Sequence, residues 1–324
     1  MKSGVNAWIF GSMSLEDKLR AALEVGFSGI ELNYGDDVTA ENVGKVERPS
    51  GLEFPSLCTG LFWKYPLNSP DEAVREKGIA LGIDMVRAAA ELGAKTVLVV
   101  PGVNYSGADY RSLIRLSSDS LKRIGAVARD EGVKVGVEEV WNKMLYSPAE
   151  FSDFLEGLGE GFGAYFDVGN VMEIGYPLQW ARELRGKIVG VHFKDYDLGK
   201  RQFVPLLQGD VPWKEVVDEI SPWYTGYAVV EQGPYKGDRL QAARDAASAM
   251  KVILGTRRAE RADAGRWRAP QKRADPQART THNCWPRPVR DRLIARALVC
   301  RARTRSERGW GGRGGFLSQG YYRV

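Results

Sequence analysis

The feature that most constrains the fold is an alternation of short apolar strands with helices, repeated eight times before Gly255. The predicted strands are Val5–Phe10, Gly29–Asn33, Pro55–Gly60, Thr96–Val100, Lys134–Val140, Ala164–Phe166, Ile188–Val191 and Tyr227–Gln232. The predicted helices are Ser14–Val25, Thr39–Val46, Pro70–Leu92, Tyr110–Glu131, Pro148–Leu158, Pro177–Leu184, Trp213–Ile220 and Gly237–Leu254. Eight such units in about 250 residues predict a (β/α)8 TIM barrel, a single α/β domain. A doubly wound open sheet is the alternative, but Ile9–Ser12 lacks the glycine-rich turn that it favours.

The charge of the chain divides it into two unlike parts. Residues 256–324 hold 18 of the 46 Lys and Arg and 5 of the 41 Asp and Glu, so they carry +13 while residues 1–255 carry −8. We therefore expect a catalytic barrel over 1–255 and an Arg-rich tail over 256–324. Three interpretations of the tail stay open: a basic arm for nucleic acid, an unstructured appendage, and a non-native reading frame, which we favour.

Composition also bears on location and partners. The chain has no apolar run of about 18 residues, and its N-terminus lacks the apolar core of a signal peptide. Cys58, Cys284 and Cys300 lie far apart, which predicts neither a disulfide framework nor a cysteine zinc site. These features predict a cytoplasmic protein without a membrane partner; whether it forms a homo-oligomer stays open.

Acidic residues and a histidine stand at the ends of the last four predicted strands. They are Glu138 or Glu139, Asp167, His192 and Glu231, about one repeat apart. In a barrel these strand ends meet at one mouth, so the four side chains are predicted to bind one metal ion. Three carboxylates and one imidazole favour Mn²⁺, with Mg²⁺ or Co²⁺ as alternatives.

Five segments carry a resemblance to a known family: VEEVWNK, YFDVGN, VHFKD, LLQGDVPW and VVEQ. In this order they resemble the signatures of the sugar phosphate isomerase/epimerase family with the xylose-isomerase-like barrel, which includes L-xylulose 5-phosphate 3-epimerase and the ketose 3-epimerases. The resemblance covers residues 1 to about 254. It implies that Glu138, Asp167, His192 and Glu231 are the metal ligands and that Asn142 belongs to the segment opened by Glu138. Strand alternation also turns Glu138 into the barrel. Asn170 stands where free-ketose epimerases have a His that helps to bind substrate, and Asn at this position is more similar to the phosphosugar branch. The resemblance makes Asn142 and Asn170 candidates for binding the substrate.

The predicted site suits deprotonation of carbon next to a ketone. A divalent cation stabilises the resulting enediolate, and a carboxylate takes the proton. Epimerisation needs a base on each face, which Glu138 and Glu231 could supply. An aldose–ketose isomerase, which needs one base, stays open as an alternative, as does a non-catalytic sugar-binding barrel. An apurinic endonuclease is disfavoured because residues 1–255 hold one histidine, His192.

Other residues near the predicted mouth are candidates for binding the sugar or sugar phosphate. Lys194 follows His192 by two positions and could hold a hydroxyl or phosphate, although a salt bridge is nearly as good an interpretation. Lys200 and Arg201 lie in the loop after strand seven, where barrels often bind phosphate. Trp8, Trp63 and Trp141 stand at strand ends, where aromatic side chains wall sugar pockets.

Overall fold

In a computed structural model, which describes residues 1–238 and 240–264, eight parallel strands close into a barrel. Around the barrel the order is β1-β10-β7-β6-β5-β4-β3-β2, and β1 pairs with both β10 and β2. Their bounds are β1 Lys2–Asn6, β2 Gly29–Asn33, β3 Ser56–Cys58, β4 Thr96–Val99, β5 Lys134–Glu138, β6 Phe162–Asp167, β7 Ile188–Phe193 and β10 Tyr227–Val230. The predicted (β/α)8 barrel is confirmed.

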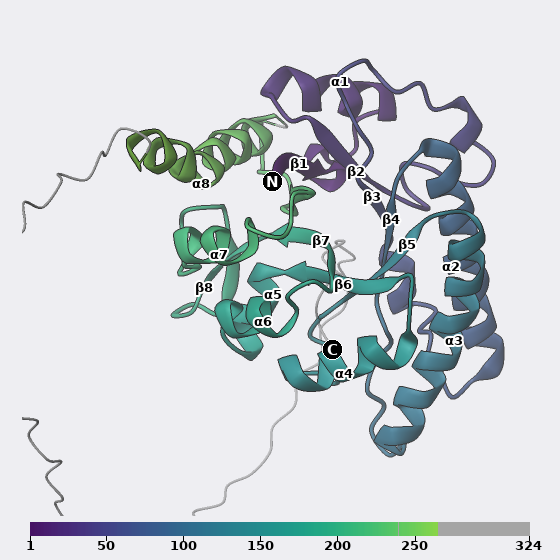
Figure 1. Cartoon of the computed structure of the whole chain (residues 1–324). Coiled ribbons are helices and arrows are strands. Elements are labelled where there is room, and N and C mark those ends of the chain that lie inside the picture. The colour runs from purple at the N-terminus through teal and green to yellow at the C-terminus, as the bar shows by residue number, and fades with distance from the viewer. Residues whose placement is uncertain (239, 265–324) are drawn as a thin grey trace, which may run out of the picture. The chain divides into compact units, whose positions relative to one another are not determined.

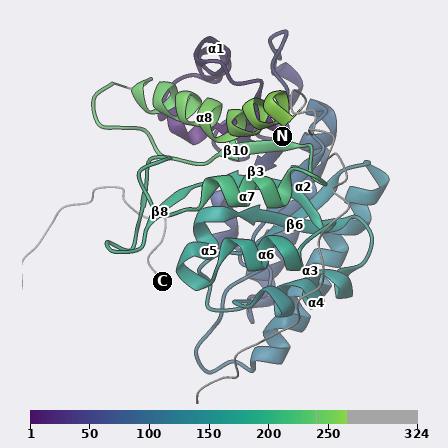
Figure 2. The same ribbon diagram turned by 60° about the vertical axis from the view of Figure 1, so that its left-hand side comes forward.

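Helices surround the strands (Figure 1). They are α1 Leu15–Val25, α2 Glu72–Leu92, α3 Tyr110–Asp130, α4 Pro148–Leu158, α5 Val168–Ile174, α6 Pro177–Glu183, α7 Trp213–Ile220 and α8 Gln241–Ala264. Ser14 and Ser147 begin α1 and α4 by accepting hydrogen bonds from backbone N–H groups of the first turn, as N-caps do. Helix α8 packs against both α1 and α7, which completes the ring of helices (Figure 2).

The centre of the barrel is filled by Tyr165 of β6, which is buried. Its ring lies between two glycines of the neighbouring strands: a Cβ atom on Gly136 would lie 3.0 Å from Tyr165 Cδ2, and one on Gly190 would lie 2.4 Å from Cε2. Neither strand could carry a larger residue there without moving the ring. The two glycines therefore make room for the Tyr165 ring inside the barrel.

The bounds of several predicted elements differ from the observed ones. The first strand was expected to run to Phe10, but it ends at Asn6, whose side chain accepts a hydrogen bond from Trp8 N and begins the 3-10 helix Ala7–Phe10. The helix expected at Thr39–Val46 is reduced to the 3-10 turn Val43–Lys45. Helix α8 continues to Ala264, past the expected end of the barrel domain, and Ala242 and Ile253 are among its buried residues.

Helix α5 and the two strands β8 Asp195–Asp197 and β9 Gln202–Val204 were not predicted. Helix α5 starts directly after β6, because Asp167 accepts a hydrogen bond from Asn170 N at 2.8 Å. Strands β8 and β9 form an antiparallel hairpin that follows β7.

Among the described residues, no helix has the length and apolar character needed to cross a membrane. The interpretations of the Arg-rich tail fall almost wholly on residues 265–324, which lie outside the described residues.

Candidate metal centre

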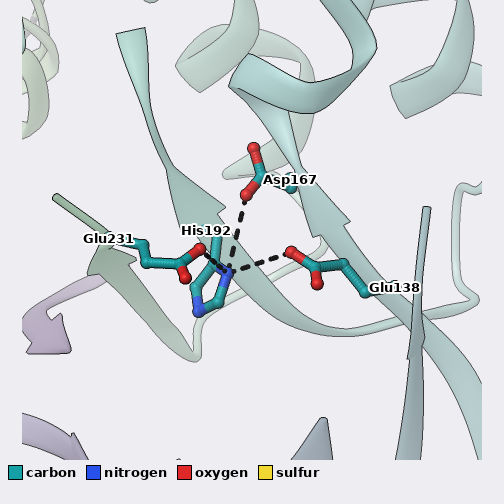
Figure 3. A group of neighbouring side chains, drawn as sticks. All are labelled: Glu138, Asp167, His192 and Glu231. Atoms are coloured by element: carbon teal, nitrogen blue, oxygen red, sulfur yellow. Dashed lines mark hydrogen bonds and ion pairs between the residues drawn. The ribbon is translucent and has the colours of Figure 1, made fainter. Parts of the chain in front are cut away.

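Four adjacent strands, β5, β6, β7 and β10, each bring one side chain to the same point of the C-terminal mouth. Glu138 and Asp167 end β5 and β6, His192 lies near the end of β7, and Glu231 follows β10. One ligand atom from each residue lies within 4.8 Å of the other three. Figure 3 shows the three carboxylates directed at one nitrogen of the imidazole. The structure therefore brings together the four residues that were expected as ligands.

The spacing of these atoms suits a divalent cation. His192 Nδ1 lies 3.0 Å from Glu231 Oε2, 3.3 Å from Glu138 Oε1 and 3.6 Å from Asp167 Oδ2. With ligand bonds of about 2.1 Å, neighbouring ligand atoms around a cation are about 3 Å apart. Small movements of the side chains would place all four atoms at bonding distance from one ion. The group thus forms a candidate site for a divalent metal.

Lys194 lies against two of the same carboxylates. Its Nζ is 2.9 Å from Asp167 Oδ2 and 2.5 Å from Glu231 Oε2, and the lysine side chain is 5% exposed. The ammonium therefore contacts two oxygens that a bound cation would use. A metal ion held by Asp167 and Glu231 would compete with Lys194 for these oxygens.

The surroundings of Glu138 and Glu231 displace the pKa values of these two glutamates in opposite directions. Burial raises the pKa of Glu138 to about 7, and His192 and Lys194 oppose this shift only in part. Burial acts to raise the pKa of Glu231 as well, but there Lys194 and His192 outweigh it and the pKa is lowered. Two carboxylates of one site with pKa values displaced in opposite directions are typical of acid–base pairs.

Glu139, the alternative to Glu138, has a different environment. Its Oε1 accepts a hydrogen bond from Asp167 N at 2.5 Å, and the residue is buried. Burial raises the pKa of Glu139 well above its usual range, and the nearby charges of Asp167 and Glu138 add to this. Glu139 thus supports the backbone of the neighbouring strand, while Glu138 is the one grouped with His192.

Two of the expected sugar-binding residues lie beside the metal group. Asn170 Nδ2 donates to Glu139 O at 2.9 Å and faces Glu138 Oε1 at 3.4 Å. Trp141 Nε1 donates to Asn170 O at 2.9 Å, and its ring stacks on Phe203 of β9 with centroids 4.9 Å apart. The hairpin that sequence analysis missed thus holds an aromatic wall next to the candidate ligands.

Other expected binding residues are engaged elsewhere. Asn142 Nδ2 donates to Gly102 O in the loop after β4, and Asn142 Oδ1 accepts from Met144 N, so this side chain joins the loops that follow β4 and β5. Lys200 pairs with Asp197 at 2.7 Å, and Arg201 pairs with Glu173.

Trp8 and Trp63 both lie in 3-10 helices after their strands. Trp8 is 44% exposed, and its ring carbon Cζ2 would lie 3.2 Å from a Cβ on Gly233, which comes soon after Glu231. Trp63 is partly buried and packs against the core.

Sequence analysis missed a residue that touches the group directly. Glu31 of β2 is wholly buried, and its Oε1 lies 2.8 Å from His192 Nε2. The signal for it was an acidic residue inside the apolar strand Gly29–Asn33, but its partner is 161 positions away.

A cavity of about 550 Å³ opens at the opposite, N-terminal end of the barrel. Lys2, Glu53, Ser56, Tyr165 and Tyr227 are among its lining residues. The ligand geometry, and not this cavity, identifies the candidate site, because barrel chemistry is placed at the C-terminal ends of the strands.

Comparisons with known proteins agree with this architecture. Residues 19–253 match the model of the family described as "Xylose isomerase-like TIM barrel". L-ribulose-5-phosphate 3-epimerases from Salmonella heidelberg (strain SL476) and Escherichia coli (strain SE11) are both 25% identical; the alignments cover 67% and 68% of this chain and 79% and 80% of theirs.

Solved structures show the same fold. That of an L-ribulose 3-epimerase matches with a TM-score of 0.70 at 20% identity, covering 84% of this chain and 99% of its own. That of the IOLI protein, with a bound zinc atom, matches with a TM-score of 0.68 at 19% identity, covering 79% and 98%. The resemblance stated from the sequence is confirmed. The chain belongs to the xylose isomerase-like TIM barrel family, and its epimerase relatives are enzymes of the isomerase class.

Proposed function

We propose that this protein is a divalent-metal-dependent 3-epimerase of a ketose or ketose phosphate. The observation that carries the proposal is the group of Glu138, Asp167, His192 and Glu231, with ligand atoms within 4.8 Å of one another at the C-terminal mouth. Relatives named L-ribulose-5-phosphate 3-epimerase support the choice of reaction and substrate class. Mn²⁺ is the proposed ion because the ligand set is rich in carboxylate oxygen, with Mg²⁺ and Co²⁺ as alternatives.

A bound cation would supply Lewis-acid stabilisation of the negative charge that develops on two adjacent substrate oxygens. The chain's own residues must then move the proton. Glu138 and Glu231 approach the group from β5 and β10, which are separated in the barrel by β6 and β7. A sugar carbon held between them would meet one carboxylate on each face. We assign the two glutamates as the acid–base pair for that reason.

The surrounding residues fit roles in substrate binding. The stacked rings of Trp141 and Phe203 offer an apolar wall to a sugar. Lys194, once displaced from its carboxylates, would have an ammonium to offer to a substrate oxygen. A phosphate on the substrate could recruit Lys200 and Arg201 if it replaced their present partners, Asp197 and Glu173.

The test is hydrogen exchange in D₂O with Mn²⁺ and a panel of ketoses and ketose phosphates. The proposal expects deuterium at C3 together with formation of the C3 epimer. Deuterium at C1 of the ketose, together with formation of the aldose, would instead identify an isomerase. No exchange with any member of the panel, in protein shown to bind Mn²⁺, would contradict the proposal and favour a sugar-binding barrel.

The variants Glu138→Gln and Glu231→Gln distinguish a mechanism with one catalytic base from a mechanism with two. Each should stop net epimerisation while retaining exchange of the proton on the face whose carboxylate survives, so the two variants label opposite epimers. Bound metal is measured in both, because both residues are also proposed ligands. If one variant loses all exchange and the other keeps substantial turnover, the two-base mechanism is wrong.

A further inference from the structure

The carboxylate of Glu31 lies inside the barrel, directly beneath the metal group. Its two oxygens accept from four side chains on four different strands. Asn6 Nδ2 and His192 Nε2 lie 2.7 Å and 2.8 Å from Oε1; Ser56 Oγ and Tyr165 OH each lie 2.7 Å from Oε2. A wholly buried carboxylate is costly to desolvate even when it is hydrogen-bonded, and an apolar side chain would serve packing at least as well. Packing alone therefore does not explain why Glu31 is at this position.

The orientation of His192 shows what the function of Glu31 is. One ring nitrogen, Nε2, faces Glu31, and the other, Nδ1, faces Glu138, Asp167 and Glu231. A carboxylate accepts a hydrogen bond but donates none when ionised, so it keeps a proton on Nε2. In the neutral ring, which is the form that binds a cation, Nδ1 then carries the lone pair, and Nδ1 is the nitrogen that faces the three carboxylates.

We propose that Glu31 is a positioning residue of the metal centre, which fixes both the ring orientation and the tautomer of His192 so that Nδ1 can bind the cation. Without this partner, a neutral ring could carry its proton on Nδ1 and donate it to Glu231 or Glu138. That hydrogen bond would occupy the nitrogen that a metal needs. Carboxylate partners of metal-binding histidines raise metal affinity in this way.

The contacts around Glu31 hold it for this role. Ser56 Oγ and Tyr165 OH also lie 2.9 Å from each other, so the two donors to Oε2 are linked. The Tyr165 ring meets the His192 ring edge-on, with centroids 4.6 Å apart, and is itself held between Gly136 and Gly190. The position of the imidazole is thus set from below by residues of the barrel interior, before any ion enters from the mouth.

The role assigned to Glu31 rests on the metal centre of the proposed function. Measurements of metal affinity test the metal centre and the role of Glu31 separately. Calorimetric titration of the full chain with Mn²⁺ should give a Kd that rises about 10- to 100-fold in Glu31→Gln. Glu53→Gln is the matched control, because Glu53 is an exposed carboxylate paired with Lys2 at 2.9 Å, and its Kd should equal that of the wild type. Failure of the wild type to bind metal would overturn the metal centre itself. Equal Kd values in the wild type and Glu31→Gln would overturn the role of Glu31 alone.

Nitrogen-15 NMR of labelled histidine gives a readout that loss of packing alone would not change. The chain has two histidines, and His282→Gln leaves the signals of His192. In metal-free protein, at a pH where the ring is neutral, we expect the proton on Nε2; in Glu31→Gln the proton should move to Nδ1 or be divided between the two nitrogens. The same pattern in both proteins would overturn the proposal. Should Glu31→Gln fail to fold, Ser56→Ala removes one donor to Oε2 and should raise the Kd by a smaller factor, and an unchanged Kd would then overturn it.

Discussion

The two halves of the barrel contribute to the candidate site in different ways. Strands β5, β6, β7 and β10 carry the four candidate ligands at their C-terminal ends. Strands β1, β2 and β3 carry none of them, but they supply Asn6, Glu31 and Ser56, which meet beneath His192. The second half, with β5, β6, β7 and β10, places the charged ligands at the mouth, and the first half, with β1, β2 and β3, holds the His192 ring in position from inside the barrel. A barrel site of this kind depends on strands that contribute no ligand.

The largest effect is expected from changing a ligand of the second half. Asp167→Asn removes a charge that faces both Lys194 and His192 and leaves a weaker donor oxygen for the cation. We expect Mn²⁺ binding and epimerisation to fall below detection, with the fold retained by circular dichroism. Wild-type affinity in this variant would show that the four residues do not act as one site, and the contrast between the halves would lose its basis.

Lys194→Met tests what balances the ligand charges in the metal-free protein. Removing one partner of a buried ion pair costs about 3–5 kcal/mol, so the metal-free variant should unfold at a much lower denaturant concentration. Mn²⁺ should restore more stability to the variant than it adds to the wild type, because the ion no longer has to displace the ammonium. Equal stabilisation by Mn²⁺ in both proteins would mean that Lys194 does not compete for Asp167 and Glu231.

Tyr165→Phe tests how the barrel interior supports the metal centre, and it leaves all four candidate ligands unmutated. The hydroxyl that is lost donates to Glu31 and lies 2.9 Å from Ser56 Oγ, so both groups lose a buried partner. We expect the free energy of unfolding to fall by about 1–3 kcal/mol and the Mn²⁺ affinity to fall by less than in Glu31→Gln. If Tyr165→Phe lowered the Mn²⁺ affinity as much as Asp167→Asn does, residues of the barrel interior would matter as much for metal binding as the candidate ligands.

The smallest effect is expected from ending the chain after Gly255. Ala242, Met250 and Ile253 of α8 are buried and precede that point, so the contacts that these residues make with the barrel remain. We propose that residues 1–255 fold and bind metal alone, with a midpoint of thermal unfolding close to that of the whole chain. Loss of cooperative unfolding would show that the barrel needs residues beyond Gly255.

The barrel could be predicted because it depends on a local pattern. Apolar strands alternating with helices gave all eight parallel strands, and alternation within β5 chose Glu138 over Glu139. The candidate ligands could be named because each stands at a strand end. In contrast, the end of β1 depends on Asn6, whose side chain caps the following turn instead of continuing the strand.

Contacts between distant residues were beyond such reasoning. Glu31 has an unremarkable place in an apolar strand, and only folding places it against His192 and Tyr165. The partners of Lys200 and Arg201 likewise became visible only once the hairpin after β7 was placed.

The pairing of β1 with β10 has a consequence for synthesis. Lys2 of β1 pairs with Tyr227 of β10, so β1 has no partner strand on that side until β10 has been synthesised. At about 5–20 residues per second, the ribosome needs tens of seconds to synthesise the residues between them. Glu231 is also the last candidate ligand to be made, so the nascent chain has no complete metal site until the barrel is ready to close. Lys194 emerges before Glu231 and is built into the same group. Lys194 thus supplies the candidate ligands with a positive charge while the barrel closes, and a metal ion would replace it only after folding.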